Sequence, residues 1–287
     1  MNSPREIIKK GSKSFALASL FLPASQRADV YTLYAWFRHC DDVIDSSNSQ
    51  TDDLKNLKEQ TFVQSSTSQF VALQKLMFEK KLSNYYFNEF FEGLRTDLEN
   101  KGFETLSQLE LYCYRVAGIV GLIMCPLIGV RHSQALSHAC ALGLGMQLTN
   151  ICRDVQEDAQ NGRIYLPREM LTQDFSCQDL VRSPDKAYAT VLQLLELADF
   201  YYAQGNSGLK YLPFRVAIAI GCASHIYRQI GLKIRSLGPE SLKQRVYVTG
   251  LEKIKCVGLG TLAALRSRFE GIQPIPKDLE LPIYYKN

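Results

Sequence analysis

Tyr34-Ala-Trp-Phe-Arg-His-Cys-Asp-Asp-Val-Ile-Asp45 is the most informative segment of the chain. Apolar side chains recur through and just before it at spacings of three and four, the pattern of an amphipathic helix. This apolar stripe consists of Val30, Leu33, Phe37, Cys40 and Ile44. At about 100° per residue, a second set falls on a narrow arc beside the stripe. Its members are Tyr34, Arg38, Asp41 and Asp45. We therefore expect these carboxylates to line a cleft at the edge of an apolar surface.

The two carboxylates of this arc, Asp41 and Asp45, lie one helical turn apart. Like charges at that spacing destabilise an isolated helix by roughly 0.2–0.5 kcal/mol. A divalent cation with oxygen ligands would offset the repulsion. Asp42 points away from the arc and is expected on the helix surface, whereas Trp36 is expected in the core.

A second acidic segment runs from Gln147 to Asp158. Four side chains again share an arc of roughly 80° next to apolar positions. They are Gln147, Asn150, Asp154 and Asp158. A single row of polar side chains on a helix, here called an acidic ladder, is more often a solvated surface than a binding site. Two acidic ladders with the same placement beside apolar positions favour a binding site. Mg²⁺ held between protein oxygens and a diphosphate fits this pattern, and Mn²⁺ is the alternative ion. The basic side chains available as further donors are Lys13, Arg38, Arg153 and Arg245.

Helical periodicity extends over most of the chain, and hairpin signals are absent. Residues 142–155, 191–202 and 216–234 show the same three- and four-residue spacing. No internal repeat or long linker divides the sequence. We expect an all-α fold in a single domain, 1–287, with a less regular tail at about 272–287.

Composition narrows the class of protein further. The 287 residues are 46% hydrophobic and 22% charged, with a net charge of +4, which excludes a disordered chain and gives no sign of a nucleic-acid partner. The eight cysteines lack metal or C-x-x-C spacing, so buried free thiols in a reducing cytoplasm are expected. The most apolar run, 116–130, contains Pro126 and is too short to span a bilayer.

Taken in order, several motifs resemble those of the squalene/phytoene synthases, which join two prenyl diphosphates head to head. The matching pieces are Gly11-Ser-Lys-Ser-Phe15, residues 33–45, Tyr112-Cys-Tyr-Arg-Val-Ala-Gly-Ile-Val-Gly121, residues 147–158 and Gly162-Arg-Ile-Tyr-Leu-Pro167. The likeness covers roughly residues 8–248. The first and third pieces are most similar to the bacterial phytoene-forming branch.

The resemblance implies an isoprenoid-synthase fold, with helices around a central active-site cavity. It places Mg²⁺ on Asp41 and Asp45 at one side and on Asn150, Asp154 and Asp158 at the other. The implied diphosphate-binding residues are Tyr34, Arg38, Gln147, Arg153, Tyr227 and Arg245, with Ser12, Lys13 and Ser14 in the same pocket. Tyr112 would stand near the reacting carbons. Small residues would leave room for the prenyl tails: Val116, Ala117, Gly118, Gly121 and Gly143. Glu157 and the loop through Arg163 would help to close the site.

The implied reaction condenses two geranylgeranyl diphosphates through prephytoene diphosphate to phytoene and releases diphosphate. The proton-abstracting base stays open between a Tyr hydroxyl and the released diphosphate. Residues 258–263 fit G-x-G-x-x-A, but they lack the room for a βαβ unit. A small-residue helix contact is therefore expected there, and no NADPH is expected.

Three alternatives remain at this stage. The first is a squalene or dehydrosqualene synthase that uses farnesyl diphosphate. The second is a head-to-tail elongase or a terpene cyclase, for which residues 41–45 fit D-D-x-x-D but the second cluster does not. The third is a non-catalytic assembly factor, against which the intact acidic ladders argue. Peripheral membrane contact is expected from the lipid substrates, and the oligomeric state stays open.

Overall fold

Every element in the described part of this computed structural model is helical. The description covers residues 3–46, 49–63, 65–130 and 132–269, so the expected irregular tail at 272–287 lies outside it. The α-helices are α1 (Pro4–Gly11), α2 (Lys13–Ser19), α3 (Ala24–Ile44), α4 (Thr51–Phe62), α5 (Ser68–Lys80), α6 (Asn84–Glu99), α7 (Leu106–Cys113), α8 (Ile119–Leu127), α9 (Gln134–Arg153), α10 (Val155–Gln160), α11 (Cys177–Arg182), α12 (Tyr188–Ser207), α13 (Phe214–Leu237) and α14 (Gly250–Arg266). Short turns are η1 (Tyr114–Gly118), η2 (Arg168–Met170), η3 (Pro184–Ala187), η4 (Gly208–Tyr211) and η5 (Pro239–Lys243). The all-α prediction is confirmed.

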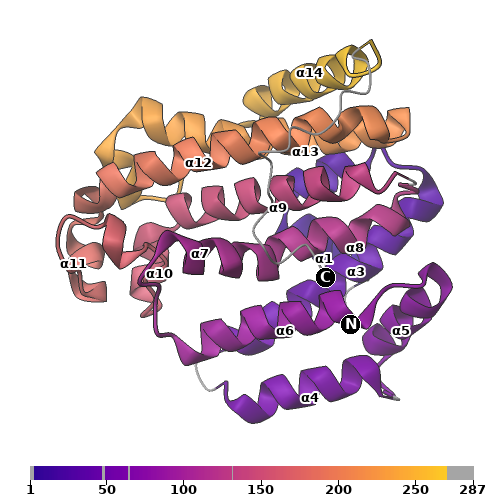
Figure 1. Ribbon diagram of the computed structural model, residues 1–287, viewed down its shortest axis with the longest axis horizontal. Coiled ribbons are helices and arrows are strands. Elements are labelled where there is room, and N and C mark those ends of the chain that lie inside the picture. The colour runs from indigo at the N-terminus through magenta and orange to yellow at the C-terminus, as the bar shows by residue number, and fades with distance from the viewer. Residues whose placement is uncertain (1–2, 47–48, 64, 131, 270–287) are drawn as a thin grey trace.

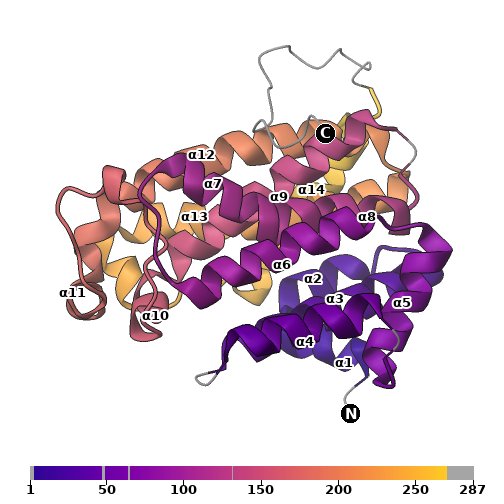
Figure 2. The same ribbon diagram turned by 60° about the horizontal axis from the view of Figure 1, so that its bottom comes forward.

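Helix α9 runs through the middle of the bundle (Figure 1). It packs against α8 and η1 on one side and against α12 and α13 on the other. Helix α3 contacts α1, α5, α6 and α8, and α14 covers α13 at the outer edge. Figure 2 shows the N-terminal helices α1 to α5 gathered beside α6 and α8. The two acidic segments, residues 34–45 and 147–158, therefore lie on different helices of the bundle, α3 for the first and α9 with α10 for the second.

One large hydrophobic cluster joins α3 to α13. Trp36 lies at its centre with no exposed surface, as predicted, and contacts the rings of Phe87, Phe90 and Phe91. This continuity supports the single-domain expectation, which stays a prediction. All eight cysteines are free, and seven of them are buried as predicted, whereas Cys177 is only partly buried.

Glycines let α9 approach the preceding helical segment closely. A Cβ atom on Gly143 would lie 2.3 Å from the carbonyl oxygen of Ala117, and one on Gly121 would lie 2.3 Å from that of Ala139. A real Cβ cannot be that close to backbone, so only glycine fits. Gly118 serves the same close packing and was wrongly grouped with the residues that leave room for a ligand, because its missing Cβ faces Leu144 and Cys140.

The second acidic helix is not continuous, contrary to expectation. It breaks at Asp154, whose φ of -103° and ψ of 14° separate α9 from α10. Aspartate competes with the helical backbone for hydrogen bonds and favours helix ends. The backbone N–H of Asp158 still donates to the Asp154 carbonyl at 2.7 Å, so the ladder keeps its spacing across the break.

The continuous helical segment Leu106–Leu127 is long and apolar enough to cross a membrane by length and composition alone. This segment is longer than the run of 116–130 considered from sequence. The 18-residue window of this segment that meets the test has a mean hydropathy of 1.4, and half of that window is buried inside the protein. Core helices also combine these properties, and Figure 1 places α7 and α8 alongside α9 within the bundle.

Candidate active site

Two adjoining cavities occupy the space between α3, α9 and the intervening helices. The first, here called the polar cavity, has a volume of about 220 Å³. Its polar lining consists of Arg38, Asp41, Asp45, Asp97, Tyr112, Gln147, Asn150, Asp154, Asp158, Arg163 and Tyr165. The second, here called the apolar cavity, has a volume of about 310 Å³ and is walled by α2, α3, η1, α8, α9 and α13. Asp41, Val116, Gln147 and Asn150 line both, so a charged chamber opens directly onto an apolar one.

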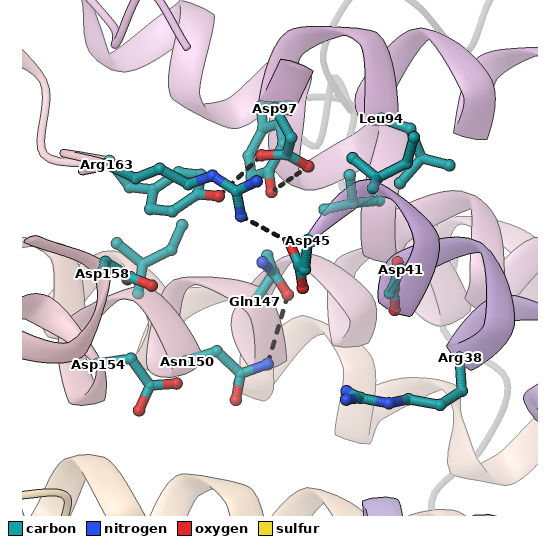
Figure 3. Close-up of a pocket in the computed structure, with 15 residues that line it drawn as sticks. Arg38, Asp41, Asp45, Leu94, Asp97, Gln147, Asn150, Asp154, Asp158 and Arg163 are labelled. Carbon is teal, nitrogen blue, oxygen red and sulfur yellow. Dashed lines mark hydrogen bonds and ion pairs between the residues drawn. The ribbon is translucent and has the colours of Figure 1, made fainter. Parts of the chain in front are cut away.

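Helix α3 supplies one wall of the polar cavity. Asp41 and Asp45 project from its last turn toward α9 (Figure 3). Burial raises the pKa of Asp41 from 3.8 to about 7, and the neighbouring Asp45 adds to the shift. Asp42 instead pairs with Arg38 at 2.5 Å and its side chain is 55% exposed, which confirms its placement on the helix surface.

Helices α9 and α10 supply the opposite wall (Figure 3). The amide nitrogen of Asn150 donates to Gln147 Oε1 at 3.3 Å, and the buried Oδ1 of Asn150 has no hydrogen-bond partner. Burial, with help from Asp154 and Glu157, raises the pKa of Asp158 to about 8. All five residues expected to bind metal, two on α3 and three here, therefore line one cavity.

A hydrogen-bonded cluster on the same cavity was missed from the sequence. Asp97, on α6, accepts hydrogen bonds from the hydroxyls of Tyr112 at 3.1 Å and Tyr165 at 2.7 Å. Burial raises the pKa of Asp97 to about 6 despite these bonds. Arg163 donates to Asp45 Oδ1 at 2.6 Å and so ties the loop after α10 to α3. The sequence signal for Asp97 is that residues 92–97 also resemble a segment of the squalene/phytoene synthases, and this resemblance assigned Asp97 no role.

The predicted basic residues take different positions. Arg38 lines the polar cavity. Arg153 forms a paired contact with Asp154, at 2.7 and 2.5 Å, and Arg245 bridges Asp154 and Glu157 from outside the cavity lining. These contacts hold Asp154 in place. The expected role of Glu157 in closing the site stays a prediction.

Tyr34 and Tyr227 line the apolar cavity, where they contact the ring of Phe15. Burial raises the pKa of Tyr34 to about 12, so its hydroxyl stays protonated. Ser12 caps α2 by accepting from the Phe15 N–H at 3.2 Å. The structure does not place Ser12, Lys13 or Ser14 on the lining of either cavity, and Lys13 is exposed. Their predicted role in binding diphosphate stays a prediction.

The oxygen-rich walls fit a hard divalent cation. Mg²⁺ prefers oxygen ligands, usually takes one or two carboxylates, and completes its shell with water and phosphate. The unpartnered Asn150 Oδ1 and the crowded carboxylates are donors of this kind. Within the described ranges, no three His, Cys, Asp or Glu side chains gather into a metal cluster of their own. The arrangement therefore suits ions shared with a bound diphosphate better than an all-protein cage.

The raised pKa values predict a pH-dependent stability. Folding raises the pKa of Asp41 to about 7 and that of Asp158 to about 8, so the folded protein binds more protons than the unfolded chain between about pH 4 and 8. The free energy of unfolding of the metal-free protein contributed by these groups must then fall as pH rises through that window. Ions that bind the carboxylates displace the protons and restore stability, increasingly so at higher pH.

Thermal unfolding in EDTA, and in Mg²⁺ with inorganic diphosphate, checks this between pH 5.5 and 8.5. The gain in Tm from Mg²⁺ and diphosphate should increase with pH, and the double variant Asp41→Asn/Asp158→Asn should show a flatter pH dependence in EDTA. A gain that is constant or largest at pH 5.5 would contradict the assignment.

Comparison with known proteins agrees with this geometry. The squalene/phytoene synthase family model matches residues 8–252. The chain is 39% identical to a 15-cis-phytoene synthase of Paracoccus sp., over 93% of this chain and 92% of the relative. It is 36% identical to a 15-cis-phytoene synthase of Enterobacter agglomerans, over 94% of this chain and 97% of the relative. The chain therefore belongs to the squalene/phytoene synthase family.

Solved structures show the same fold. A ligand-bound dehydrosqualene synthase is 31% identical, with a TM-score of 0.79 over 92% of this chain and 95% of that one. A squalene synthase from Alicyclobacillus acidocaldarius is 24% identical, with a TM-score of 0.70 over 82% of this chain and 92% of that one, a likeness of fold alone. The expected isoprenoid-synthase architecture is confirmed.

Proposed function

We propose that this protein is a prenyltransferase of the 15-cis-phytoene synthase type. It condenses two geranylgeranyl diphosphates head to head, through prephytoene diphosphate, to phytoene, the first hydrocarbon of carotenoid biosynthesis. One observation carries the proposal: the charged polar cavity opens onto the apolar cavity through shared lining residues. A prenyl diphosphate has the same two parts, an anionic head and a long apolar tail.

Each of the two acidic walls would hold diphosphate through bound Mg²⁺. Asp41 and Asp45 would hold Mg²⁺ on the α3 side, and Asn150, Asp154 and Asp158 would hold it on the other. Bound there, Mg²⁺ would neutralise the charge that builds on the leaving diphosphate. Arg38 lies within the same cavity and would add bidentate hydrogen bonds to the phosphates. Arg153 and Arg245 would act mainly by fixing Asp154.

The protein's own residues contribute to the carbon chemistry by shaping the cavity and by excluding water from it. Cleavage of the C1–O bond of one substrate leaves an allylic cation, which the C2–C3 double bond of the second attacks. Proton loss then closes the cyclopropane of prephytoene diphosphate. Apolar walls at Val116, Ala117 and Gly143 exclude water that would quench the cation. Tyr112, whose hydroxyl donates a hydrogen bond to Asp97 at 3.1 Å, would lie near the reacting carbons.

The proposed reaction ends without reduction by NADPH, as phytoene formation does. Residues 258–263 lie inside α14, and a Cβ on Gly260 would lie 2.4 Å from the backbone nitrogen of Cys222. The interpretation of this segment as a small-residue helix contact is confirmed for Gly260. Gly258 has open space around it and takes no part in the contact.

Product analysis tests the proposal. The purified protein with Mg²⁺ is incubated separately with geranylgeranyl and farnesyl diphosphate, with and without NADPH, and the extracted hydrocarbons are identified by mass spectrometry. We expect phytoene from geranylgeranyl diphosphate without NADPH, and no product in EDTA. Dehydrosqualene or squalene as the main product would favour the farnesyl-using alternative. A folded protein without product from either substrate would favour a non-catalytic role.

Location in the cytoplasm and peripheral contact with a membrane belong to the same proposal. The substrates and the product are lipids, so an enzyme that handles them gains from lying at a bilayer surface. Oligomeric state does not enter the argument, because both acidic walls and both cavities are built from one chain.

A further inference from the structure

Helix α14 has the reverse of the usual amphipathic arrangement. Its buried face consists of the small residues Cys256, Gly260 and Ala264. Gly260 crosses α13 at Gly221, where a Cβ on Gly221 would lie 2.8 Å from the Gly260 carbonyl oxygen. A surface helix normally turns its large apolar side chains toward the protein. In α14 the contact with α13 is made by the smallest side chains instead.

The large apolar side chains of α14 point outward. Leu251 is 82% exposed and Ile254 is 69% exposed, and Leu262 and Leu265 are also exposed. At 100° per residue these four positions span roughly 80° of the helix, so they form a single stripe. Phe269, just beyond the helix, is 91% exposed. Figure 1 shows α14 at the outer edge of the molecule, with α13 directly below it in the view. Large apolar side chains exposed together on one helix face indicate an interaction surface.

The charges around this stripe are positive. Lys255 and Arg266 are exposed on its flank, and Arg268 follows with its guanidinium 5.7 Å from the ring centroid of Phe214. The single carboxylate of α14, Glu252, is occupied, because it closes the N-terminal capping box with Thr249 and pairs with Lys233 at 3.0 Å. The outward face therefore combines apolar side chains with unbalanced positive charge.

We propose that the outward face of α14 docks on an anionic lipid bilayer. Its apolar stripe would enter the boundary between headgroups and acyl chains, and its Lys and Arg side chains would contact lipid phosphates. A second copy of this chain fits the face less well. Two such faces packed together would bring Lys255 and Arg266 against like charges, with no carboxylate on the stripe to balance them. The proposal rests on the membrane contact included in the proposed function and assigns it to one surface. It can be tested separately from the reaction, because α14 lines neither cavity.

Vesicle flotation of the full-length protein tests the proposal. The vesicles contain either phosphatidylcholine alone or phosphatidylcholine with about one third phosphatidylglycerol. We expect binding to the anionic vesicles that weakens with added salt. The variant Ile254→Glu/Leu262→Glu should lower the partition coefficient at least tenfold, and Lys255→Glu/Arg266→Glu should remove the preference for phosphatidylglycerol.

Phe78→Glu is the matched control, because Phe78 is 86% exposed on α5, away from α14. It should bind vesicles like the unaltered protein. Circular dichroism confirms folding, and activity on detergent-dispersed substrate should be unchanged in the α14 variants, which separates this test from that of the reaction.

Three results would overturn the proposal. One is equal vesicle binding by the α14 variants and the control. Another is a change from dimer to monomer in the variants, measured by light scattering, without an effect on lipid binding. The third is binding to vesicles only after removal of residues 270–287, which would make that segment the occupant of the face.

Discussion

Asp41→Asn is expected to lower kcat/KM by roughly 10³-fold, equivalent to about 4 kcal/mol of lost transition-state stabilisation. The carboxylate is half-buried and faces the opposite acidic wall across the polar cavity. An amide keeps its size but not its charge, so it holds a divalent cation poorly and leaves the departing diphosphate less neutralised. Initial rates of phytoene formation over a range of Mg²⁺ concentrations measure the effect.

Asp42→Asn is the matched control, one residue along the same helix. Asp42 does not line the cavity and its side chain is largely exposed beside Arg38. Exposed ion pairs contribute little, so less than about a threefold change is expected. Asp41→Asn should also leave the metal-free protein at least as stable as before, because it removes an acid whose charged form is disfavoured by burial and by Asp45. Equal kinetic effects of the two substitutions would contradict the role given to Asp41.

Trp36→Ala is expected to cost about 3–5 kcal/mol of unfolding free energy. Trp36 is fully buried and belongs to α3, the helix that carries Asp41 and ends at Asp45. It contacts four phenylalanine rings, and its indole N–H donates to Thr61 Oγ1 at 3.2 Å. Truncation leaves a cavity and an unpaired hydroxyl acceptor. Equilibrium denaturation by guanidinium chloride, followed by circular dichroism, measures the loss.

Two comparisons isolate the packing contribution. Trp36→Phe keeps an aromatic ring and should lose clearly less stability than Trp36→Ala. Tyr85→Ala removes a partly exposed aromatic side chain and should cost under about 1 kcal/mol. If Trp36→Ala cost no more than Tyr85→Ala, the aromatic cluster would not be the support of α3 that the structure indicates.

Local periodicity explains why the two acidic walls could be predicted. The stripe that ends at Ile44 and the arc that ends at Asp45 are properties of a single helix, and helical spacing fixes them. Whether two such arcs face each other depends on packing, and the ordered family motifs supplied that step. The break at Asp154 escaped prediction, because it accompanies contacts with Arg153 and Arg245.

Long-range contacts explain what was missed. Asp97 joins the site through Tyr165, and Arg163 reaches Asp45 across 118 positions of sequence. No spacing rule connects such residues. The outward stripe of α14 was also missed, because periodicity alone does not say which side of a helix meets the protein. The close approach of Gly260 to α13 shows which face of α14 packs against the protein.

The central claim is that the two acidic walls hold diphosphate through shared divalent ions while the prenyl tail lies in the apolar cavity. A crystal structure with Mn²⁺ and a non-ionising thio-diphosphate analogue of geranylgeranyl diphosphate tests it most directly. We predict anomalous peaks beside Asp41 or Asp45 and beside Asn150, Asp154 or Asp158, with the tail against Val116 and Gly143. Metal peaks away from both walls, or a tail outside the apolar cavity, would contradict the account.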